Sequence, residues 1–114
     1  IRRQLADDPT DQSIHARVFA TVRYLLRHRI AIGRPVTYVD ATNLTRKERR
    51  PYLKIAKEHG CIAEALYFDV PLETCLERNR NRARVVPEVA MQTLAAKLQP
   101  PETREGFSRI VIVR

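Results

Sequence analysis

The sequence predicts an α/β protein built on a parallel sheet. Segments with apolar residues at helical spacing alternate with short continuous apolar runs, in the order helix, strand, helix, strand, helix, helix, strand. The runs are separated by helices rather than by tight turns, which is the pattern of parallel strand connections. At 114 residues the chain has about the length of one domain, so residues 1–114 are expected to form a single unit.

The first helix is expected to follow a polar break at residues 7–11, with Thr10 or Asp11 as its N-cap. Apolar residues then recur at helical spacing, and Gly33 is placed to end this helix in a left-handed conformation. The apolar run at residues 36–39 predicts a short strand that ends on a carboxylate.

The second helix is expected to begin at a capping box, because Thr45 and Glu48 have the required spacing. Gly60 ends this helix. Pro51 falls in its second turn and removes a hydrogen bond there, which predicts a kink or a later start. The apolar run at residues 62–70 is the next expected strand.

Proline positions mark the elements of the C-terminal half. Pro71 suits the first turn of a helix that continues through Arg78, and a further helix is expected at residues 87–98. Two prolines at residues 100–101 stop it, and residues 110–113 form a last buried strand. Three strands make a thin sheet, so its N-terminal strands are expected to be missing from this chain.

The composition points to an anionic partner. The formal net charge is +8 at pH 7, the isoelectric point is near 10.2, and arginine supplies most of the positive charge. Such an excess favours nucleic acid, a nucleotide or an acidic surface, although many small basic proteins carry basic side chains that are only solvated. Without a long uncharged apolar run, no membrane span is expected.

Cysteine and histidine usage argues against a metal centre made by the protein alone. Cys61 and Cys75 lie far apart without a Cys-x-x-Cys spacing, and the three histidines show no metal-ligand spacing. Both thiols are therefore expected to be reduced and buried, in a cytoplasmic protein.

A carboxylate and two small polar residues follow the first predicted strand. Ligands of α/β proteins bind beyond the carboxyl ends of the strands, which places Asp40, Thr42 and Asn43 where chemistry is expected. Asp40 can orient a magnesium ion or a sugar hydroxyl, and the other two can bind an acceptor. The alternative is an ordinary strand-to-helix turn, since Asp, Thr and Asn are common turn formers.

Four arginines alternate along residues 78–84. If the helix continues through them, Arg78 and Arg82 share one face, and Arg80 and Arg84 share another. Arginine grips phosphate bidentately, so the first pair is expected to point into a nucleotide pocket as part of a lid over residues 78–92. A solvated or nucleic-acid-contacting face is an equal alternative for the second pair.

These motifs, in this order, resemble the polynucleotide-kinase-like P-loop kinases, a group of AAA-type ATP-binding proteins. The resemblance extends over essentially the whole chain and is most specific at the Asp-Ala-Thr-Asn turn and the Glu-Arg-Asn-x-Asn-Arg segment. Four segments carry it, at residues 1–3, 39–43, 75–82 and 104–107.

The resemblance implies a three-layer P-loop kinase fold that transfers the γ-phosphate of ATP to a hydroxyl, with Mg²⁺. Arg2 matches an arginine that binds the acceptor in that family. The aspartate that acts there as general base would lie just before Ile1. Arg78 and Arg82 match lid arginines on the ATP phosphates, and Arg82 is thereby expected to be catalytic. Three residues match the acceptor-side turn: Asp40, the expected catalytic carboxylate, with Thr42 and Asn43.

The sequence departs from that family at one point. It contains no Gly-x-x-x-x-Gly-Lys-Ser/Thr loop and only three glycines, so no backbone cradle or P-loop lysine is available for the phosphates. Truncation is the simplest explanation, and the 114 residues alone are expected to be inactive. The expected function of the complete domain is ATP-dependent phosphotransfer to a hydroxyl, with a nucleic-acid 5′-hydroxyl favoured over a smaller acceptor. The alternative is a non-catalytic nucleic-acid- or nucleotide-binding module of the same fold.

Overall fold

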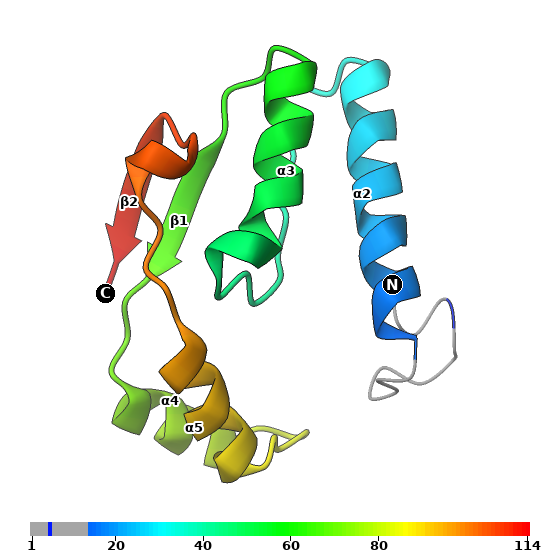
Figure 1. The fold of residues 1–114 in the computed structure, drawn as a ribbon. Coiled ribbons are helices and arrows are strands. Elements are labelled where there is room, and N and C mark those ends of the chain that lie inside the picture. Colours follow the sequence, from blue (N-terminus) through cyan, green and yellow to red (C-terminus); the bar gives the residue numbers. More distant parts are fainter. Residues whose placement is uncertain (1–4, 6–13) are drawn as a thin grey trace. The chain divides into compact units, whose positions relative to one another are not determined.

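The computed structural model describes residue 5 and residues 14–114 (Figure 1). The described residues belong to two compact units that divide between Ala41 and Thr42. Arg2 and the expected N-cap residues Thr10 and Asp11 lie outside the described residues.

Helix α2 (His15–Ala31) dominates the first unit and ends as the sequence predicts. Gly33 has φ +78°, its N–H donates to the Ile30 carbonyl, and the Arg34 N–H donates to the Arg29 carbonyl, each at 3.0 Å. This pair of bonds satisfies two of the carbonyls that a helix end leaves open, and it requires a left-handed residue. The glycine therefore explains where α2 stops.

The predicted strand at residues 36–39 does not form, which corrects the expected count of three strands. Val36 and Tyr38 are 58% and 79% exposed. Arg29 holds this segment instead, by donating to the Val36 carbonyl at 2.9 Å and to the Thr37 hydroxyl at 3.0 Å. A strand needs a neighbouring strand for its backbone groups, and among the described residues none pairs with residues 36–39.

The second unit begins with helix α3 (Arg46–Glu58), which starts at the predicted N-cap. The Thr45 hydroxyl accepts from the Glu48 N–H at 3.2 Å, while the Glu48 carboxylate reaches back to the Leu44 N–H at 3.1 Å. Pro51 lies inside the helix, so the later start considered for it is wrong. Gly60, with φ +66°, ends α3 as predicted.

Strands β1 (Glu64–Phe68) and β2 (Arg109–Val113) pair in parallel, side by side in Figure 1. Glu64 lies opposite Arg109 and Phe68 opposite Val113. The chain between them passes through α4 (Leu72–Arg80), α5 (Glu88–Lys97) and the short 3₁₀ helix η1 (Thr103–Glu105). The α/β class and the parallel pairing are thus confirmed.

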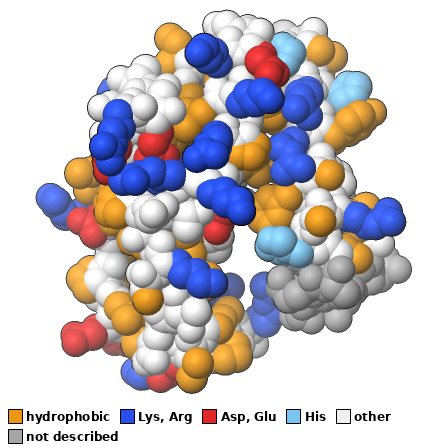
Figure 2. Space-filling view, in the orientation of Figure 1, with side chains coloured by type: hydrophobic (Ala, Val, Ile, Leu, Met, Phe, Trp, Pro, Cys, Tyr) orange, Lys and Arg blue, Asp and Glu red, His pale blue; other side chains and the backbone are white. Residues whose placement is uncertain are grey.

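Few described side chains are fully buried. Val18 in the first unit and Ile55 in the second are the buried apolar residues, at 7% and 1% exposure. Cys61 and Cys75 are both free, but Cys61 is exposed, which corrects the expectation that it is buried. Lys and Arg side chains outnumber Asp and Glu on the face shown in Figure 2, in keeping with the net charge of +8. In the described part of the chain, no helix is long and apolar enough to cross a membrane.

Candidate functional site

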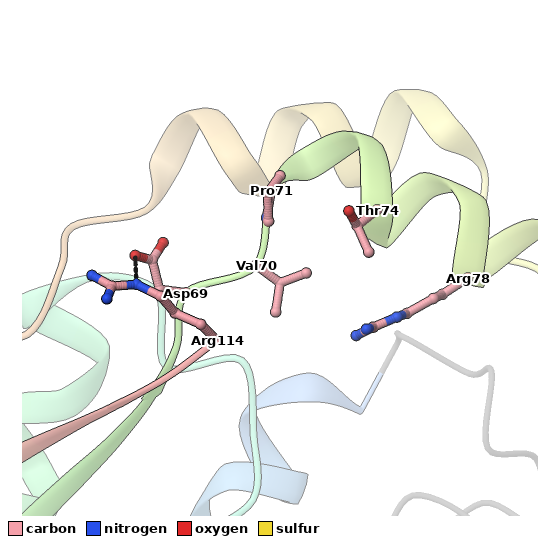
Figure 3. Close-up of a pocket in the computed structure, with 6 residues that line it drawn as sticks. All are labelled: Asp69, Val70, Pro71, Thr74, Arg78 and Arg114. Carbon is pink, nitrogen blue, oxygen red and sulfur yellow. Dashed lines mark ion pairs between the residues drawn. The ribbon is translucent and has the colours of Figure 1, made fainter.

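An open pocket of about 380 Å³ lies at the carboxyl ends of β1 and β2. Parallel strands present their ligand sites at this edge. Figure 3 shows the residues that line the pocket, which are Asp69, Val70, Pro71, Thr74, Arg78 and Arg114.

The strand ends and the first turns of α4 place these side chains. Asp69 follows β1, and its N–H donates to the Val113 carbonyl at 2.8 Å, which extends the parallel pairing to the pocket. Arg114 follows β2, and its Nε lies 3.7 Å from Asp69 Oδ2. Thr74 and Arg78 are four residues apart on α4, so they share the helix face that lines the pocket (Figure 3).

This set of groups suits an anion that also carries hydrogen-bonding atoms. The two guanidinium groups of Arg78 and Arg114 outnumber the single carboxylate of Asp69, so the charged groups of the lining sum to a positive charge. Guanidinium groups are the preferred partners of phosphate oxygens, and the Thr74 hydroxyl can donate or accept. The pocket can therefore bind a phosphate group.

The arginine run is only partly helical. Helix α4 ends at Arg80 and Asn81 is its C-cap, so Arg82 and Arg84 lie beyond the helix and are exposed. The expectation that Arg78 and Arg82 share a helix face is therefore wrong, and so is the equivalent pairing of Arg80 with Arg84. The i to i+4 spacing has meaning only on a continuous helix.

Arg80 is engaged in a structural contact. Its Nε lies 2.6 Å from Glu88 Oε1, which links the end of α4 to the start of α5. The hydrogen bond and the charge of Glu88 raise the pKa of the Arg80 guanidinium, with a smaller contribution of the same sign from Glu77, although desolvation opposes it. This side chain is held by its carboxylate partner.

A buried asparagine closes the loop that carries these arginines. Asn79 is 2% exposed; its Nδ2 donates to the Val86 carbonyl at 2.6 Å, and its Oδ1 accepts from the Val86 N–H at 2.9 Å. The side-chain amide thus pairs with both backbone groups of one residue. The short loop of residues 81–85, which carries Arg82 and Arg84, is therefore closed by this contact between Asn79 and Val86.

We predict that Asn79→Ala loosens this loop. The substitution leaves two backbone groups of Val86 without their partner, and the free energy of unfolding should fall by about 1–3 kcal/mol. Denaturant unfolding and amide exchange at Val86 measure the two effects. Asn81→Ala is the matched control: this exposed side chain makes one hydrogen bond, to the Glu77 carbonyl at 3.2 Å, and its loss should stay within about 0.5 kcal/mol. Equal losses would contradict the prediction.

The Asp40 to Asn43 motif spans the boundary between the two units. Asp40 is exposed and lies in the first unit, whereas Thr42, exposed, and Asn43, half-buried, open the second. Asn43 has φ +44°, the left-handed conformation that Asn tolerates better than most residues. The backbone is thus turned sharply just before α3.

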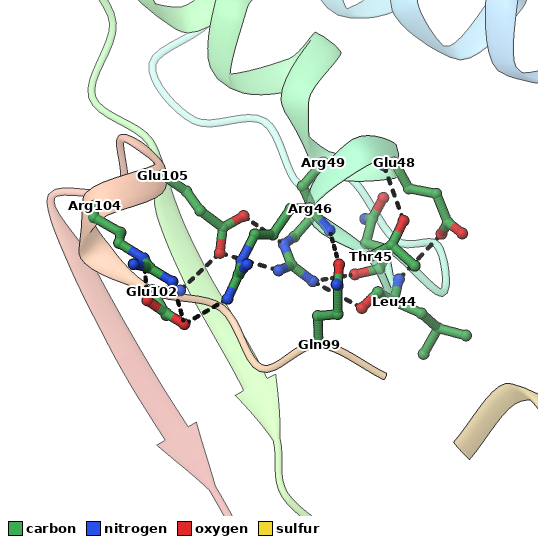
Figure 4. A network of polar contacts seen from close by, with 10 residues as sticks. Leu44, Thr45, Arg46, Glu48, Arg49, Gln99, Glu102, Arg104 and Glu105 are labelled. Atoms are coloured by element: carbon green, nitrogen blue, oxygen red, sulfur yellow. Dashed lines mark hydrogen bonds and ion pairs between the residues drawn. The ribbon is translucent and has the colours of Figure 1, made fainter. Parts of the chain in front are cut away.

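A buried guanidinium supports this turn (Figure 4). Arg49 Nη1 donates to the carbonyls of Asn43 and Leu44, at 2.9 and 3.0 Å. Its Nε and Nη2 bind the two carboxylate oxygens of Glu105, at 2.9 and 3.0 Å, and both side chains are 7% exposed. All of these contacts are charge-assisted, so Arg49 ties the turn firmly to η1.

Neighbouring contacts complete the network. Glu102 accepts from Arg46 at 2.7 Å and also pairs with Arg104, and its N–H donates to Glu105 at 2.8 Å. Burial alone would raise the pKa of Glu105, but the hydrogen bonds from Arg49 and from the Glu102 N–H outweigh it. Together with the charges of Arg49 and Arg46, they lower the pKa below its ordinary value.

Sequence reasoning selected Arg78, which does line the pocket, but missed the other residues of the lining; its role as a phosphate ligand stays a prediction. Asp69 lies near the end of the strand predicted at residues 62–70, and the rule that selects Asp40, a carboxylate at the carboxyl end of a predicted strand, also selects Asp69. Arg114 and Arg49 gave no local signal, because their partners are distant in sequence, and the resemblance at residues 104–107 did not show that Glu105 pairs with Arg49. Chemical roles stay predictions for the other residues selected from the sequence, namely Arg2, Asp40, Thr42, Asn43 and Arg82.

Comparison with known proteins supplies the family. A family model described as an AAA domain matches residues 1–101. The L-seryl-tRNA(Sec) kinase of Mus musculus is 31% identical over 77 residues, which cover 67% of this chain and 21% of that protein. The human enzyme of that name is 32% identical over 84 residues, or 73% and 24% of the two chains. That of Methanococcus maripaludis is 30% identical over 69 residues, or 60% and 27%.

The chain therefore spans about a fifth to a quarter of the length of the curated relatives that it matches. All three relatives are kinases by name. Together with the match to the family model, these names support a P-loop kinase family for this chain. Because one family model covers most of its length, the chain belongs to the AAA domain family.

Proposed function

We propose that the protein is an ATP-dependent phosphotransferase that moves the γ-phosphate of ATP to a hydroxyl group. The observation that carries this proposal is the pocket at the carboxyl edge of β1 and β2, which Arg78, Arg114 and Thr74 all line. Its position agrees with where α/β proteins bind ligands, and the relatives named as kinases favour phosphotransfer over simple anion binding.

In this proposal Arg78 and Arg114 bind phosphate oxygens of ATP, and Thr74 adds a hydrogen bond. The acceptor hydroxyl oxygen bonds to the γ-phosphorus and gives up its proton to water, the bond from that phosphorus to the bridging oxygen breaks, and ADP leaves. The negative charge spreads over the phosphoryl oxygens during this step, and fixed guanidinium groups stabilise it. Residues 78–92 act as a lid from which Arg82 also reaches the phosphates.

The acceptor side of the proposed site is the turn before α3. Thr42 and Asn43 bind the acceptor, and Asp40, two residues before Thr42 in the chain, orients a hydroxyl or a magnesium ion. The family resemblance assigns Arg2 to the acceptor as well. Among the described residues, no group of three or more His, Cys, Asp or Glu side chains could hold a metal by itself. Magnesium in phosphoryl-transfer sites is held by one or two carboxylates and the substrate phosphates, so a single exposed carboxylate such as Asp40 fits. When bound, the ion neutralises phosphate charge.

The acceptor hydroxyl is proposed to be carried by nucleic acid. No acidic residue occurs between residues 14 and 39, and α2 exposes Tyr24, 60% accessible, with its ring centroid 4.3 Å from that of His28. Arginines without acidic neighbours attract a phosphate backbone, and exposed aromatic rings stack on bases. This segment carries five arginines, namely Arg17, Arg23, Arg27, Arg29 and Arg34.

Two nucleic-acid acceptors are to be distinguished. One is the 5′-hydroxyl of a polynucleotide, which the sequence motifs favour; the other is a serine attached to tRNA, which the names of the relatives favour. The test incubates the complete protein with radiolabelled ATP, magnesium and either a 5′-hydroxyl RNA or seryl-tRNA. Label in either product supports phosphotransfer and identifies the acceptor. RNA binding without label transfer overturns the proposal and favours the binding module.

We predict that Asp40→Asn in the complete protein strongly reduces turnover and leaves the melting temperature unchanged. Asparagine keeps the turn-forming side-chain shape but loses the charge that would hold a metal or hydroxyl. Thermal unfolding and the phosphotransfer assay, applied to this one variant, separate the two roles. Normal turnover would show that Asp40 is only a turn former.

A further inference from the structure

We infer that Arg49 is a positioning residue, which sets the conformation of the turn at Thr42 and Asn43 and thereby the affinity for the acceptor. This inference rests on the proposed function, because that function makes the turn the acceptor site. Arg49 itself is 6% exposed, and its guanidinium group donates to Glu105 and to the carbonyls of Asn43 and Leu44, so it acts through the turn.

The turn is in a conformation that needs support. Asn43 is held at φ +44°, outside the regions that residues with side chains prefer. Such conformations persist where the surrounding structure over-determines them, and they gather at functional sites. Here the carbonyl of the strained residue itself accepts from Arg49 at 2.9 Å.

Three further contacts fix the next residue, Leu44. Its carbonyl accepts from Arg49 at 3.0 Å and from the Gln99 N–H at 2.8 Å, while its N–H donates to Glu48 at 3.1 Å. Leu44 thus binds groups from α3 and from the segment before η1. Asn43 and Leu44 are thus held by these contacts, whereas Thr42 stays exposed.

Glu105 fixes Arg49 in turn. The two-point contact with its carboxylate sets the plane of the guanidinium group, in the orientation in which Nη1 donates to both carbonyls. Lysine carries the same charge but has no planar fork, so it cannot bind the carboxylate at two points and also reach two carbonyls. Arg49→Lys therefore removes the geometry and keeps the charge.

The experiment compares Arg49→Lys with Arg50→Lys in the complete protein, at a temperature well below both melting points. Arg50 is the adjacent, exposed arginine of α3. We expect Arg49→Lys to raise the KM for the acceptor roughly tenfold to a hundredfold, as small misplacements of positioning groups do, with the KM for ATP unchanged. Arg50→Lys should change neither constant.

Amide hydrogen exchange gives a readout that does not depend on catalysis. Exchange at Leu44 should become faster in Arg49→Lys and stay normal in Arg50→Lys. If the wild-type protein transfers no phosphate, the proposed function fails, while exchange at Leu44 still tests the positioning role. Unchanged exchange, or equal changes in both KM values, would overturn that role. If Arg49→Lys does not fold, Glu105→Gln serves the same test, since it weakens the grip on Arg49.

Discussion

Replacing Arg78 by alanine in the complete protein is expected to lower kcat/KM for phosphotransfer by about a hundredfold to a thousandfold, the size seen when one charge-stabilising donor is removed. Arg78 lines the pocket at the carboxyl edge of the sheet, on the same face of α4 as Thr74. It is exposed, so the loss should come from the transition state while the fold and the melting temperature are preserved.

The matched control is Arg109→Ala. This arginine begins β2, at the opposite end of the strand from the pocket, and its side chain is 66% exposed in a pair with Glu64. It should leave the kinetics unchanged. Arg78→Lys should recover only part of the rate, because an ammonium group cannot bind two phosphate oxygens in a fixed plane. Wild-type kinetics in a folded Arg78→Ala protein would remove the pocket from the reaction.

Arg82→Ala tests the lid separately from the pocket. If Arg82 reaches the phosphates from its loop, turnover should fall by orders of magnitude with folding retained, as expected for an arginine that neutralises developing charge. Normal turnover would exclude Arg82 from the reaction and leave the role of Arg78 intact.

Replacing Glu105 by alanine is expected to lower the free energy of unfolding by about 3–5 kcal/mol, because it leaves the buried guanidinium of Arg49 without its counter-charge. Each side chain of the pair is 7% exposed and the contact is made at two points. Denaturant unfolding measures the loss. Glu64→Ala is the control, since its pair with Arg109 is exposed and should contribute less than about 1 kcal/mol.

The pH dependence of stability supplies a second test of Glu105. Its pKa is lowered in the folded protein, so the folded state binds protons less readily than the unfolded state does. The stabilisation is therefore complete above the ordinary pKa of a glutamate and is lost as the pH falls through the lowered value. Glu105→Gln should be less stable at neutral pH and lose less stability on acidification. An identical acid profile in both proteins would contradict this account.

The sequence by itself determined the helices and where two of them end. Gly33 and Gly60 stop α2 and α3 because a left-handed residue closes a helix by contacts within a few residues. The apolar runs of β1 and β2 and the cap of α3 are equally local signals. The prediction of a parallel α/β protein followed from their order along the chain.

Only the tertiary structure decided which of these signals were realised. Residues 36–39 have a strand composition but no strand partner among the described residues, and Arg29 binds one of their carbonyls, that of Val36. Helix α4 ended before Arg82 because Asn79 pairs with Val86 and directs the chain into a loop. Periodicity cannot show such competition between local propensity and a distant partner.

Distant partners also decided which residues make up the candidate site. Arg78 was predicted because its own segment is rich in arginine, whereas Arg114 joins the pocket only because β2 pairs with β1. Arg49 and Glu105 are 56 residues apart, and nothing in the sequence around either of them indicates that they pair. Folding brings them together out of water, where an ion pair with fixed geometry can hold the turn at Asn43.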